Sequence, residues 1–438
     1  MTSTITPRPE KAASISSIAT GISSVAIVGM GYVGLPTALG LHSQGVRTLG
    51  IDLSTQRLDL IAAGEPDLIA ADRARLEVAR RDPGFELTSE PRRLAEAEAV
   101  IVCVPTPLDS YLTPDLGPLR SACAAVVAHA RAGQTLILTS TSFVGTTRTL
   151  LMEPLKAKGF SVGTDIFVAF SPERIDPGNT AHTQARTPRV LGGATPACAT
   201  RARSVLHALT PLLHEVSSAE AAELTKLYEN SFRAVNIALA NEFAEICGTL
   251  ALDPIEITHA AATKPYGFMS FFPGPGVGGH CIPCDPHYLL WQLKKAHSDA
   301  PLIQQAMTMI AHRPRRVVDR ALETLSSAGR GVAGARVVVV GVSYKPGVQD
   351  LRESSALEII ETLLAFGAKV DYYDPLVPTI ALANGRSMDS ISEPHGTDWD
   401  LALVHTVQPG HDYDWVGHCP IVLDATYTFS HAPHRDVV

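Results

Sequence analysis

The chain has 438 residues, 45% of them hydrophobic, and its 44 acidic and 36 basic side chains give a formal charge of −8. This length accommodates two or three domains, each with its own core. The charges are dispersed, and no run of Lys or Arg could follow a phosphate backbone, so nucleic acid is excluded as an expected partner. The longest apolar stretch, near Val337–Val342, has the length of a strand and not of a membrane span. We therefore expect a soluble globular protein.

The amino terminus and the cysteines both bear on the expected cellular location. Residues 1–20 combine Ser, Thr, Ala and Pro and lack the continuous apolar stretch of a secretory signal, so we interpret them as a disordered tail. The seven cysteines are an odd number scattered along the chain, which does not resemble a disulfide framework. A reducing cytoplasm is the expected location.

Strand and helix signals alternate in the first part of the chain. Apolar runs predict strands, and a helix is expected from Leu35. The expected strands are Val25–Val28, Thr48–Asp52, Val100–Val104, Thr135–Leu138 and Ile166–Ala169. Such alternation indicates a parallel sheet covered by helices.

A helical middle separates this region from a second region of alternation. One long helix is expected from Ala219 to Leu250, because the segment is free of Pro and Gly until Gly248, and a second helical stretch from Tyr288 to Leu325. The later expected elements are strands at Arg336–Val340, Lys369–Tyr373, Leu401–His405 and Ile421–Leu423 and a helix at Ser354–Phe366.

The expected fold is therefore α/β, with two Rossmann-like, doubly wound parallel-sheet domains joined by a central helical domain that contains one long helix. The expected boundaries are 21–215 for the first sheet domain, 216–328 for the helical domain and 329–438 for the second sheet domain.

A dinucleotide-binding motif follows the first strand. Gly29, Gly31 and Gly34 form G-x-G-x-x-G around Tyr32 and Val33, and Asp52 ends the next strand. Gly29 allows a tight turn, Gly31 lets a pyrophosphate approach the helix N-terminus, and Gly34 permits close packing of helix on strand. A glycine turn in an ordinary strand–helix unit is the alternative.

Two side chains bear on the choice of cofactor. Asp52 accepts hydrogen bonds from ribose hydroxyls and repels a 2′-phosphate, so NAD is favoured over NADP. Arg57 could accommodate a 2′-phosphate, but we expect Asp52 to dominate.

Polar groups suited to chemistry occur on the long helix and after a strand. Lys226 and Asn230 are four residues apart and project from one helical face, where a lysine could hold an oxyanion and an amide could orient water or a thiolate; a solvated face is an equal alternative. Glu173 follows the strand that ends at Ala169, and a carboxylate at a strand's carboxyl end faces a cofactor site.

A single thiol follows a glycine-rich loop in PGPGVGGHCIPCDP at 273–286. Cys281 lies four residues before Asp285, and the glycines favour exposure of the thiol to a ligand. A nicotinamide cofactor beside a cysteine can oxidise an aldehyde to an acid through a thioester. The alternatives are a zinc site formed by His280, Cys281, Cys284 and His287, a redox pair of Cys281 with Cys284, and a buried core cysteine. The tight, proline-interrupted spacing argues against zinc, and we expect no metal.

These motifs together resemble the UDP-glucose/GDP-mannose dehydrogenase family of nucleotide-sugar 6-dehydrogenases. The resemblance runs from about Val25 to Thr426. Its motifs are CVPTPL at 103–108, TSTSFVGTT at 139–147, FSPERIDPGN at 170–179, LTKLYEN at 224–230, the thiol loop at 273–286 and GVSYKPGVQDLRES at 341–354.

The resemblance implies that a sugar C6 alcohol is oxidised to a carboxylate with two NAD per turnover. By analogy, Cys281 captures the aldehyde as a thiohemiacetal, which becomes a thioester and is hydrolysed. Lys226 and Asn230 match residues that stabilise the oxyanion, Thr141 and Asp285 match residues that position and activate water, and Glu173 matches a carboxylate that aids turnover.

Binding residues are also implied. The cofactor positions are Gly29, Gly31, Tyr32, Val33, Gly34, Asp52, Arg57, Thr106, Thr141 and Arg352. The substrate positions are Glu173, Lys226, Asn230, Gly278 and Lys345, where Lys345 serves the nucleotide diphosphate as a point charge. Family members are dimers through the long helix, so the expected partners are a UDP-sugar substrate and a second copy of the chain.

Two departures from the family bear on the sugar. Members that act on UDP-glucose usually carry lysine before the active-site aspartate, where this chain has Cys284, and its motifs look more like members that oxidise UDP-N-acetylhexosamines such as UDP-GlcNAc, UDP-GalNAc or UDP-ManNAc. Those members usually place an arginine shortly before the glycine loop, where this chain has Tyr266.

The expected function is NAD-dependent oxidation of a UDP-N-acetylhexosamine at C6. The alternatives are a UDP-glucose 6-dehydrogenase, a two-electron hydroxyacid dehydrogenase, which would tolerate Cys281→Ser, and a zinc-stabilised NAD-binding module. We also expect that Cys284 forms an inactivating disulfide with Cys281 under oxidation.

Overall fold

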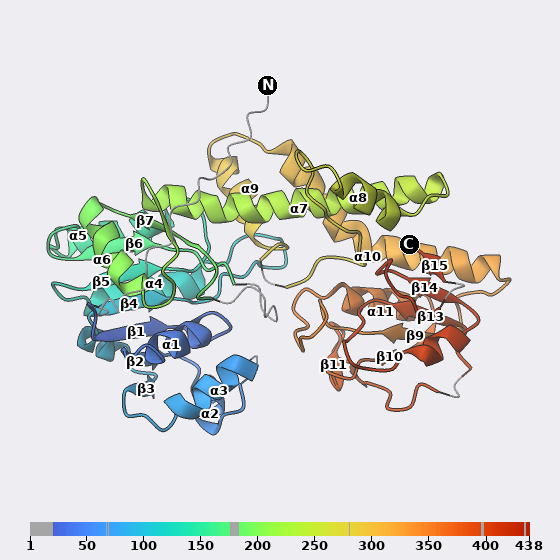
Figure 1. Ribbon diagram of the computed structural model, residues 1–438, viewed down its shortest axis with the longest axis horizontal. Coiled ribbons are helices and arrows are strands. Elements are labelled where there is room, and N and C mark those ends of the chain that lie inside the picture. Colours follow the sequence, from blue (N-terminus) through green and yellow to red (C-terminus); the bar gives the residue numbers. More distant parts are fainter. Residues whose placement is uncertain are drawn as a thin grey trace.

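The fold was obtained as a computed structural model, which describes residues 21–66, 68, 70–175, 184–279, 281–395, 398–432 and 435–438. The expected tail at residues 1–20 lies outside them. Figure 1 shows two sheet-containing regions at either end of the long helix α7 (Ala219–Thr249).

The amino-terminal region is built on a sheet that has eight strands within the described residues, in the order β3-β2-β1-β4-β5-β6-β7-β8. Neighbouring strands are parallel except β6 and β7, which are antiparallel. The strands are β1 (Ser24–Val28), β2 (Arg47–Ile51), β3 (Phe85–Thr88), β4 (Ala99–Val102), β5 (Thr135–Leu138), β6 (Phe167–Phe170), β7 (Arg189–Gly193) and β8 (Leu213–Val216).

Helices cover both faces of this sheet because successive strand residues point to opposite sides. Val25 and Ile27 of β1 pack in one apolar cluster with α1, α3 and α6, while Ala26 and Val28 pack in another with α4 and α5. The helices and turns are α1 (Gly34–His42), α2 (Thr55–Ala63), α3 (Ala70–Ala79), η1 (Pro91–Glu96), α4 (Gly117–His129), η2 (Arg148–Met152), α5 (Glu153–Ala157) and α6 (Pro196–Leu206). The doubly wound α/β arrangement is confirmed.

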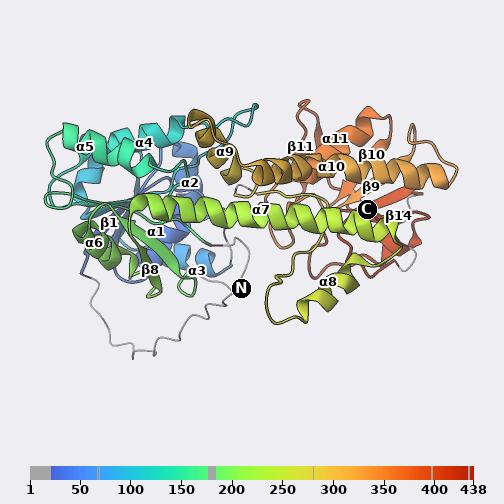
Figure 2. The same ribbon diagram turned by 90° about the horizontal axis from the view of Figure 1, so that it is seen from above.

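The central region consists of α7 with α8 (Pro254–Ala262), α9 (Asp285–Lys295) and α10 (Pro301–Ser327). Ser218 caps α7 by accepting a hydrogen bond from the Ala221 backbone N–H. Figure 2 shows α10 beside α7, and small side chains such as Ala234 and Ala238 pack there against Ala306 and Ile310.

The expected single helical stretch from Tyr288 to Leu325 is two helices. After α9, His297 takes a left-handed φ of 51°, and α10 begins at Pro301. A left-handed residue cannot continue a right-handed helix, and proline is favoured in a helix's first turn, so the chain breaks and restarts here. The break gives α9 a direction of its own, which matters because α9 starts at Asp285.

The carboxyl-terminal region holds a parallel five-stranded sheet within the described residues, ordered β10-β9-β13-β14-β15. Its strands are β9 (Arg336–Val340), β10 (Lys369–Tyr373), β13 (Leu401–Val404), β14 (Val422–Asp424) and β15 (Asp436–Val437). The antiparallel pair β11 (Thr379–Ala381) and β12 (Ser387–Asp389), helix α11 (Ser355–Ala365) and turn η3 (Asp414–His418) complete it. Across the described parts of the chain, no helix combines the length and the apolar character needed to cross a membrane.

Candidate active site

The glycine motif after β1 has the geometry of a dinucleotide-binding turn. Gly29 has a φ of +91°, and a Cβ there would lie 2.9 Å from the Cys103 carbonyl oxygen. A Cβ on Gly34 would lie 1.7 Å from the Gly29 carbonyl oxygen, so helix and strand approach as closely as glycine allows. A Cβ on Gly31 would meet no atom within 4 Å. Packing therefore requires Gly29 and Gly34, whereas Gly31 leaves open space for a bound group.

The side chains of Asp52 and Arg57 are both hydrogen-bonded to the backbone of this turn. The Asp52 carboxylate accepts hydrogen bonds from the backbone N–H groups of Met30, at 2.7 Å, and Ser54, at 2.9 Å. The Arg57 guanidinium donates to the Met30 carbonyl oxygen at 2.9 Å. Asp52 thus lies beside the glycine turn at the end of β2, where a carboxylate can receive ribose hydroxyls. These residues fit NAD.

The carboxyl-terminal region reaches the same turn through Arg352. Its guanidinium lies over the Tyr32 ring, 4.2 Å from the ring centroid, and is held by the Asp350 carboxylate at 2.6 Å and 3.0 Å. A cation over an aromatic face is attractive, and the carboxylate fixes the direction of the guanidinium. The structure therefore brings together Tyr32 and Arg352, which are 320 positions apart in the sequence.

Two other predicted cofactor positions lie after strands of the first sheet. Thr106 is buried after β4, and Thr141 is half-buried after β5. Their segments touch, since the Ser140 hydroxyl donates to the Val104 carbonyl oxygen at 2.7 Å. Val33 precedes α1 as its N-terminal capping residue.

Glu173 lies after β6 and is engaged by several donors. Its carboxylate accepts the backbone N–H groups of Arg174, at 2.9 Å, and Ile175, at 3.1 Å, and forms an ion pair with Arg189 at 3.1 Å. Arg189 is 1% exposed, so its charge is compensated where water cannot reach it. Glu173 is thus held at the carboxyl end of the strand, as its position in the sequence predicts.

The long helix α7 presents a buried polar face and not a solvated one. Lys226 and Asn230 are 9% and 2% exposed. One turn before Lys226, Glu223 is equally buried, and burial raises the pKa of its carboxyl group while hydrogen bonds from Thr147 and Gly145 oppose the rise. Sequence reasoning missed Glu223, although its spacing of three residues from Lys226 places it on the same face.

The thiol of Cys281 is exposed, and Asp285 and Asn230 lie together beside it in the fold. The amide nitrogen of Asn230 donates to the Asp285 carboxylate, and the backbone N–H of Asp285 donates to the Cys281 carbonyl oxygen at 2.9 Å. This contact joins α7 to the first turn of α9 at the thiol.

Charges of both signs act on this thiol. Loss of solvation in its protein surroundings and the negative charge of Asp285 raise the pKa of Cys281. The cations Lys226, Arg233 and Arg352 act in the opposite direction. The same cations can stabilise negative charge that develops on a bound substrate. Arg233, two helical turns after Lys226 on α7, is a further cation that sequence reasoning did not select.

The glycines before the thiol have a different role from the one the sequence suggested. A Cβ on Gly278 would lie 2.5 Å from the Tyr344 Cβ and 2.8 Å from the Glu353 carbonyl oxygen, and a Cβ on Gly276 would lie 2.5 Å from Ser355. The backbone N–H of Gly279 donates to the Arg352 carbonyl oxygen at 2.9 Å. The glycines let this loop pack against the carboxyl-terminal region, and Cys281 is exposed just beyond that contact.

Cys284 differs from Cys281 in burial. It is 6% exposed, and burial raises the pKa of its thiol to about 12. Both thiols are free. Among the described residues no three His, Cys, Asp or Glu side chains are grouped to hold a metal ion, and His280 lies outside those residues.

Lys345 follows β9 in the carboxyl-terminal region, and its ammonium group lies 5.7 Å from the centroid of the Tyr344 ring. Tyr344 is the residue that packs on Gly278, so the predicted diphosphate-binding lysine adjoins the thiol loop.

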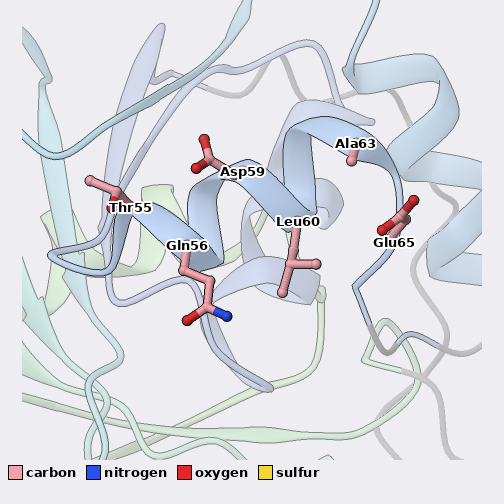
Figure 3. A pocket seen from close by; sticks show the side chains of 6 residues that line it. All are labelled: Thr55, Gln56, Asp59, Leu60, Ala63 and Glu65. Carbon is pink, nitrogen blue, oxygen red and sulfur yellow. The ribbon is translucent and has the colours of Figure 1, made fainter.

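Surface hollows also lie outside the predicted site residues. One lies along α2, and Figure 3 shows Thr55, Gln56, Asp59, Leu60, Ala63 and Glu65 around it, all from that helix and the turn after it. It contains none of the predicted site residues.

Models of one protein family match three successive parts of the chain. They are described as the UDP-glucose/GDP-mannose dehydrogenase family's NAD binding domain, at residues 23–210, its central domain, at 220–310, and its UDP binding domain, at 338–430. The chain belongs to this family. It is an NAD-dependent nucleotide-sugar dehydrogenase, and the family oxidises C6 of a UDP-sugar.

Individual relatives extend the likeness over most of the dehydrogenase. This chain is 33% identical to UDP-N-acetyl-D-mannosamine dehydrogenase of Escherichia coli (strain K12) over 351 residues, covering 78% of this chain and 82% of the relative. It is 32% identical to UDP-N-acetyl-D-glucosamine 6-dehydrogenase of Pseudomonas aeruginosa over 387 residues, covering 87% and 90%. A solved structure of UDP-D-ManNAc dehydrogenase from Pyrococcus horikoshii matches with a TM-score of 0.86 and 30% identity, covering 94% of this chain and 98% of that one.

Proposed function

We propose that this dehydrogenase converts the C6 hydroxyl of a UDP-N-acetylhexosamine to a carboxylate at Cys281, in two successive two-electron oxidations. One observation carries the proposal. An exposed thiol adjoins the Asn230–Asp285 contact and lies within the influence of Lys226, Arg233 and Arg352, so nucleophile and oxyanion stabilisers are assembled in one place.

NAD bound at the turn of Gly31 and Asp52 would supply the electron sink, taking one hydride, that is two electrons and one hydrogen, from C6 in each of the two oxidations, while the C6 hydroxyl proton would leave to solvent in the first. Cys281 adds to the C6 aldehyde carbonyl, and a C–S bond forms as the carbonyl oxygen takes up the negative charge. Lys226 and Asn230 stabilise that oxyanion. After the second oxidation the C6 carbon is a thioester of Cys281, and attack by water breaks the C–S bond, which releases the carboxylate and restores the thiol.

The remaining predicted residues position the attacking water or bind the substrate. Thr141 and Asp285 position the attacking water, Asp285 receives its proton, and Glu173 supports this step from its fixed place after β6. Lys345 binds the nucleotide diphosphate, and Gly278 keeps the thiol loop close enough to the UDP-binding region for both to contact one substrate.

The choice of sugar rests on two grounds. The relatives named above act on UDP-N-acetylhexosamines, and Cys284 takes the place of the lysine expected in enzymes for UDP-glucose. UDP-glucose remains the alternative, because Tyr266 stands where an arginine of the N-acetylhexosamine enzymes is expected.

The experiment is a measurement of NADH released per sugar consumed, with UDP-glucose, UDP-GlcNAc, UDP-GalNAc and UDP-ManNAc as substrates. We expect about two NADH per sugar, no free aldehyde, and the highest kcat/KM with one of the three N-acetylhexosamines. One NADH per sugar would overturn the four-electron reaction and favour a two-electron dehydrogenase. A preference for UDP-glucose would overturn the sugar assignment alone.

We also propose a homodimer that buries the exposed apolar stripe of α7. Large side chains repeat along it at intervals of three, four and seven residues, the pattern of one helical face. They are Leu224, Tyr228, Phe232, Leu239, Phe243, Ile246 and Leu250, each at least 39% exposed. A contiguous exposed apolar surface of this length is unusual on a monomer and is typical of a protein–protein interface. Light scattering should give twice the chain mass, and Leu239→Glu with Phe243→Glu should reduce it, whereas Val78→Glu on α3 should not.

A cytoplasmic location is part of the proposal. It is supported by the seven cysteines, none of which forms a disulfide, and by the use of NAD. Fractionation that recovered the enzyme outside the cytoplasm would contradict it.

A further inference from the structure

The loop that carries Thr141 is clamped by two helices of the central region. It spans residues 139–147, between β5 and η2. On one side, Glu223 of α7 accepts hydrogen bonds from the Gly145 N–H at 2.5 Å and from the Thr147 N–H and hydroxyl at 2.8 and 2.7 Å. Glu223 is 2% exposed, so these three donors replace the water that its carboxylate has lost.

The second side of the clamp is Gln292 of α9. Its side-chain oxygen accepts the Val144 N–H and its nitrogen donates to the Val144 carbonyl oxygen, both at 2.8 Å. The pairing resembles a contact between strands, and it holds the two peptide groups on either side of the Val144 Cα. Beside it, the rings of Phe143 and Trp291 pack with centroids 5.7 Å apart.

The two clamping helices also present the reacting groups. Lys226 and Asn230 follow Glu223 by three and seven residues on α7, so all three lie on one buried face. Gln292 lies two turns after Asp285, the first residue of α9, and Cys281 lies four residues before that first residue. The loop is therefore bound to the carriers of the oxyanion site and of the thiol, while its own strand belongs to the NAD-binding region.

We propose that Glu223 and Gln292 are positioning residues that set the place of Thr141 relative to Cys281 for hydrolysis of the thioester. This inference rests on the proposed function, in which Thr141 positions the attacking water. Neither side chain needs to touch the substrate. A displacement of about 1 Å in a positioning loop is enough to slow a reaction by roughly a hundredfold, so the clamp acts on the step that depends on Thr141.

Glu223→Gln is the direct test, because an amide replaces one acceptor oxygen with an N–H donor that faces other donors. We expect kcat to fall by about ten- to a hundredfold, with KM for the UDP-sugar falling alongside it and kcat/KM changing by less than about threefold, because only the step after acylation is slowed. A rapid burst of about two NADH per site should persist, followed by slow turnover, and intact-protein mass spectrometry should find the acyl group on Cys281.

Two control variants and a second clamp variant separate a positioning role from general damage to the fold. Glu220→Gln removes the same charge one turn earlier on α7, where Glu220 pairs with Arg148 and not with the loop, and should leave kcat within about twofold. Gln292→Met removes the second half of the clamp at similar volume and should reproduce the burst and the acyl-enzyme, whereas Gln304→Met on the exposed face of α10 should not. Hydrogen exchange of peptide 139–147 in the resting enzyme should speed up in both clamp variants and in neither control.

The outcomes are distinguishable. Loss of the NADH burst, or a rise in KM at unchanged kcat, would overturn the positioning role, and so would unaltered turnover in both clamp variants. If Glu223→Gln fails to fold, the result for Gln292→Met decides. A wild-type yield of one NADH per sugar would instead overturn the proposed function, whatever the clamp variants do.

Discussion

Two glycine-rich stretches of this dehydrogenase have similar composition and different physical reasons for it. In the motif at 29–34, two glycines are required by packing within one region and Gly31 is left open for a cofactor. In the loop at 273–279, Gly276, Gly278 and Gly279 are required because the carboxyl-terminal region packs directly on them. Glycine enrichment therefore indicates close approach of the backbone to other atoms in both places. In the motif at 29–34 a ligand explains only Gly31, whereas in the loop at 273–279 contact with the carboxyl-terminal region explains most of the glycines.

The largest effect is expected at the residue that follows the second loop. Cys281→Ser replaces the nucleophile and should lower formation of the uronic acid by roughly a thousandfold or more, because a hydroxyl is a far weaker nucleophile near neutral pH. Product formation and NADH release measure it. Cys284→Ser, which changes the buried neighbouring thiol, should retain activity within a few-fold. Full turnover with two NADH in Cys281→Ser would show that the loop does not present the reacting group.

The packing role of the second loop can be broken at Gly278. Gly278→Ala places a Cβ 2.5 Å from the Tyr344 Cβ, and we expect it to cost about 2 kcal/mol and lower the apparent Tm by several degrees. Gly274→Ala in the same loop meets no atom within 4 Å and is the control. Equal Tm values for the two variants, measured by calorimetry, would contradict the close contact between loop and carboxyl-terminal region.

The first motif should behave in the opposite way at Gly31. Gly31→Ala has room for its methyl group in the free enzyme, so Tm should stay within about 1 °C while NAD affinity falls by about tenfold, since the methyl group occupies the space of the pyrophosphate. Titration calorimetry with NAD measures this change. Gly331→Ala, also in open space but distant from the motif, should leave affinity unchanged. Normal NAD affinity in Gly31→Ala would remove the distinction between the two stretches.

The smallest effect concerns the charge around the thiol. Asp285→Asn removes a negative charge that disfavours the thiolate, so the pKa of Cys281 should fall but stay above its ordinary value, because loss of solvation is the larger cause of its rise and is unchanged. The pH dependence of alkylation by iodoacetamide in the free enzyme reports this pKa. Lys226→Met should shift the profile to higher pH, since it removes a cation that favours the thiolate. Shifts in the same direction for both variants would contradict the charge balance.

Much of the fold could be predicted because its strands are buried on both faces and therefore appear as continuous apolar runs, as in Arg336–Val340. Several of the strands that escaped prediction lack this signal. β8 has the sequence LHEV at the sheet edge, and β11 and β12 have three residues each. The antiparallel pairing of β6 with β7 depends on the path of the chain between them and has no local signature. The break at His297 was missed because a left-handed φ in a non-glycine residue is imposed by its surroundings.

The sequence by itself predicted the candidate groups for the chemistry of this enzyme: the glycine turn with Asp52, the lysine and asparagine on one helical face, and the Cys281 thiol four residues before Asp285 are local patterns that can be recognised from their spacing. The tertiary structure alone decided which of these groups meet. It joined Asn230 to Asp285, set Arg352 on Tyr32, and turned Glu223 and Gln292 toward the loop of Thr141. These contacts link residues far apart in the chain, and their geometry follows from how whole helices and sheets pack, which no short window of sequence encodes.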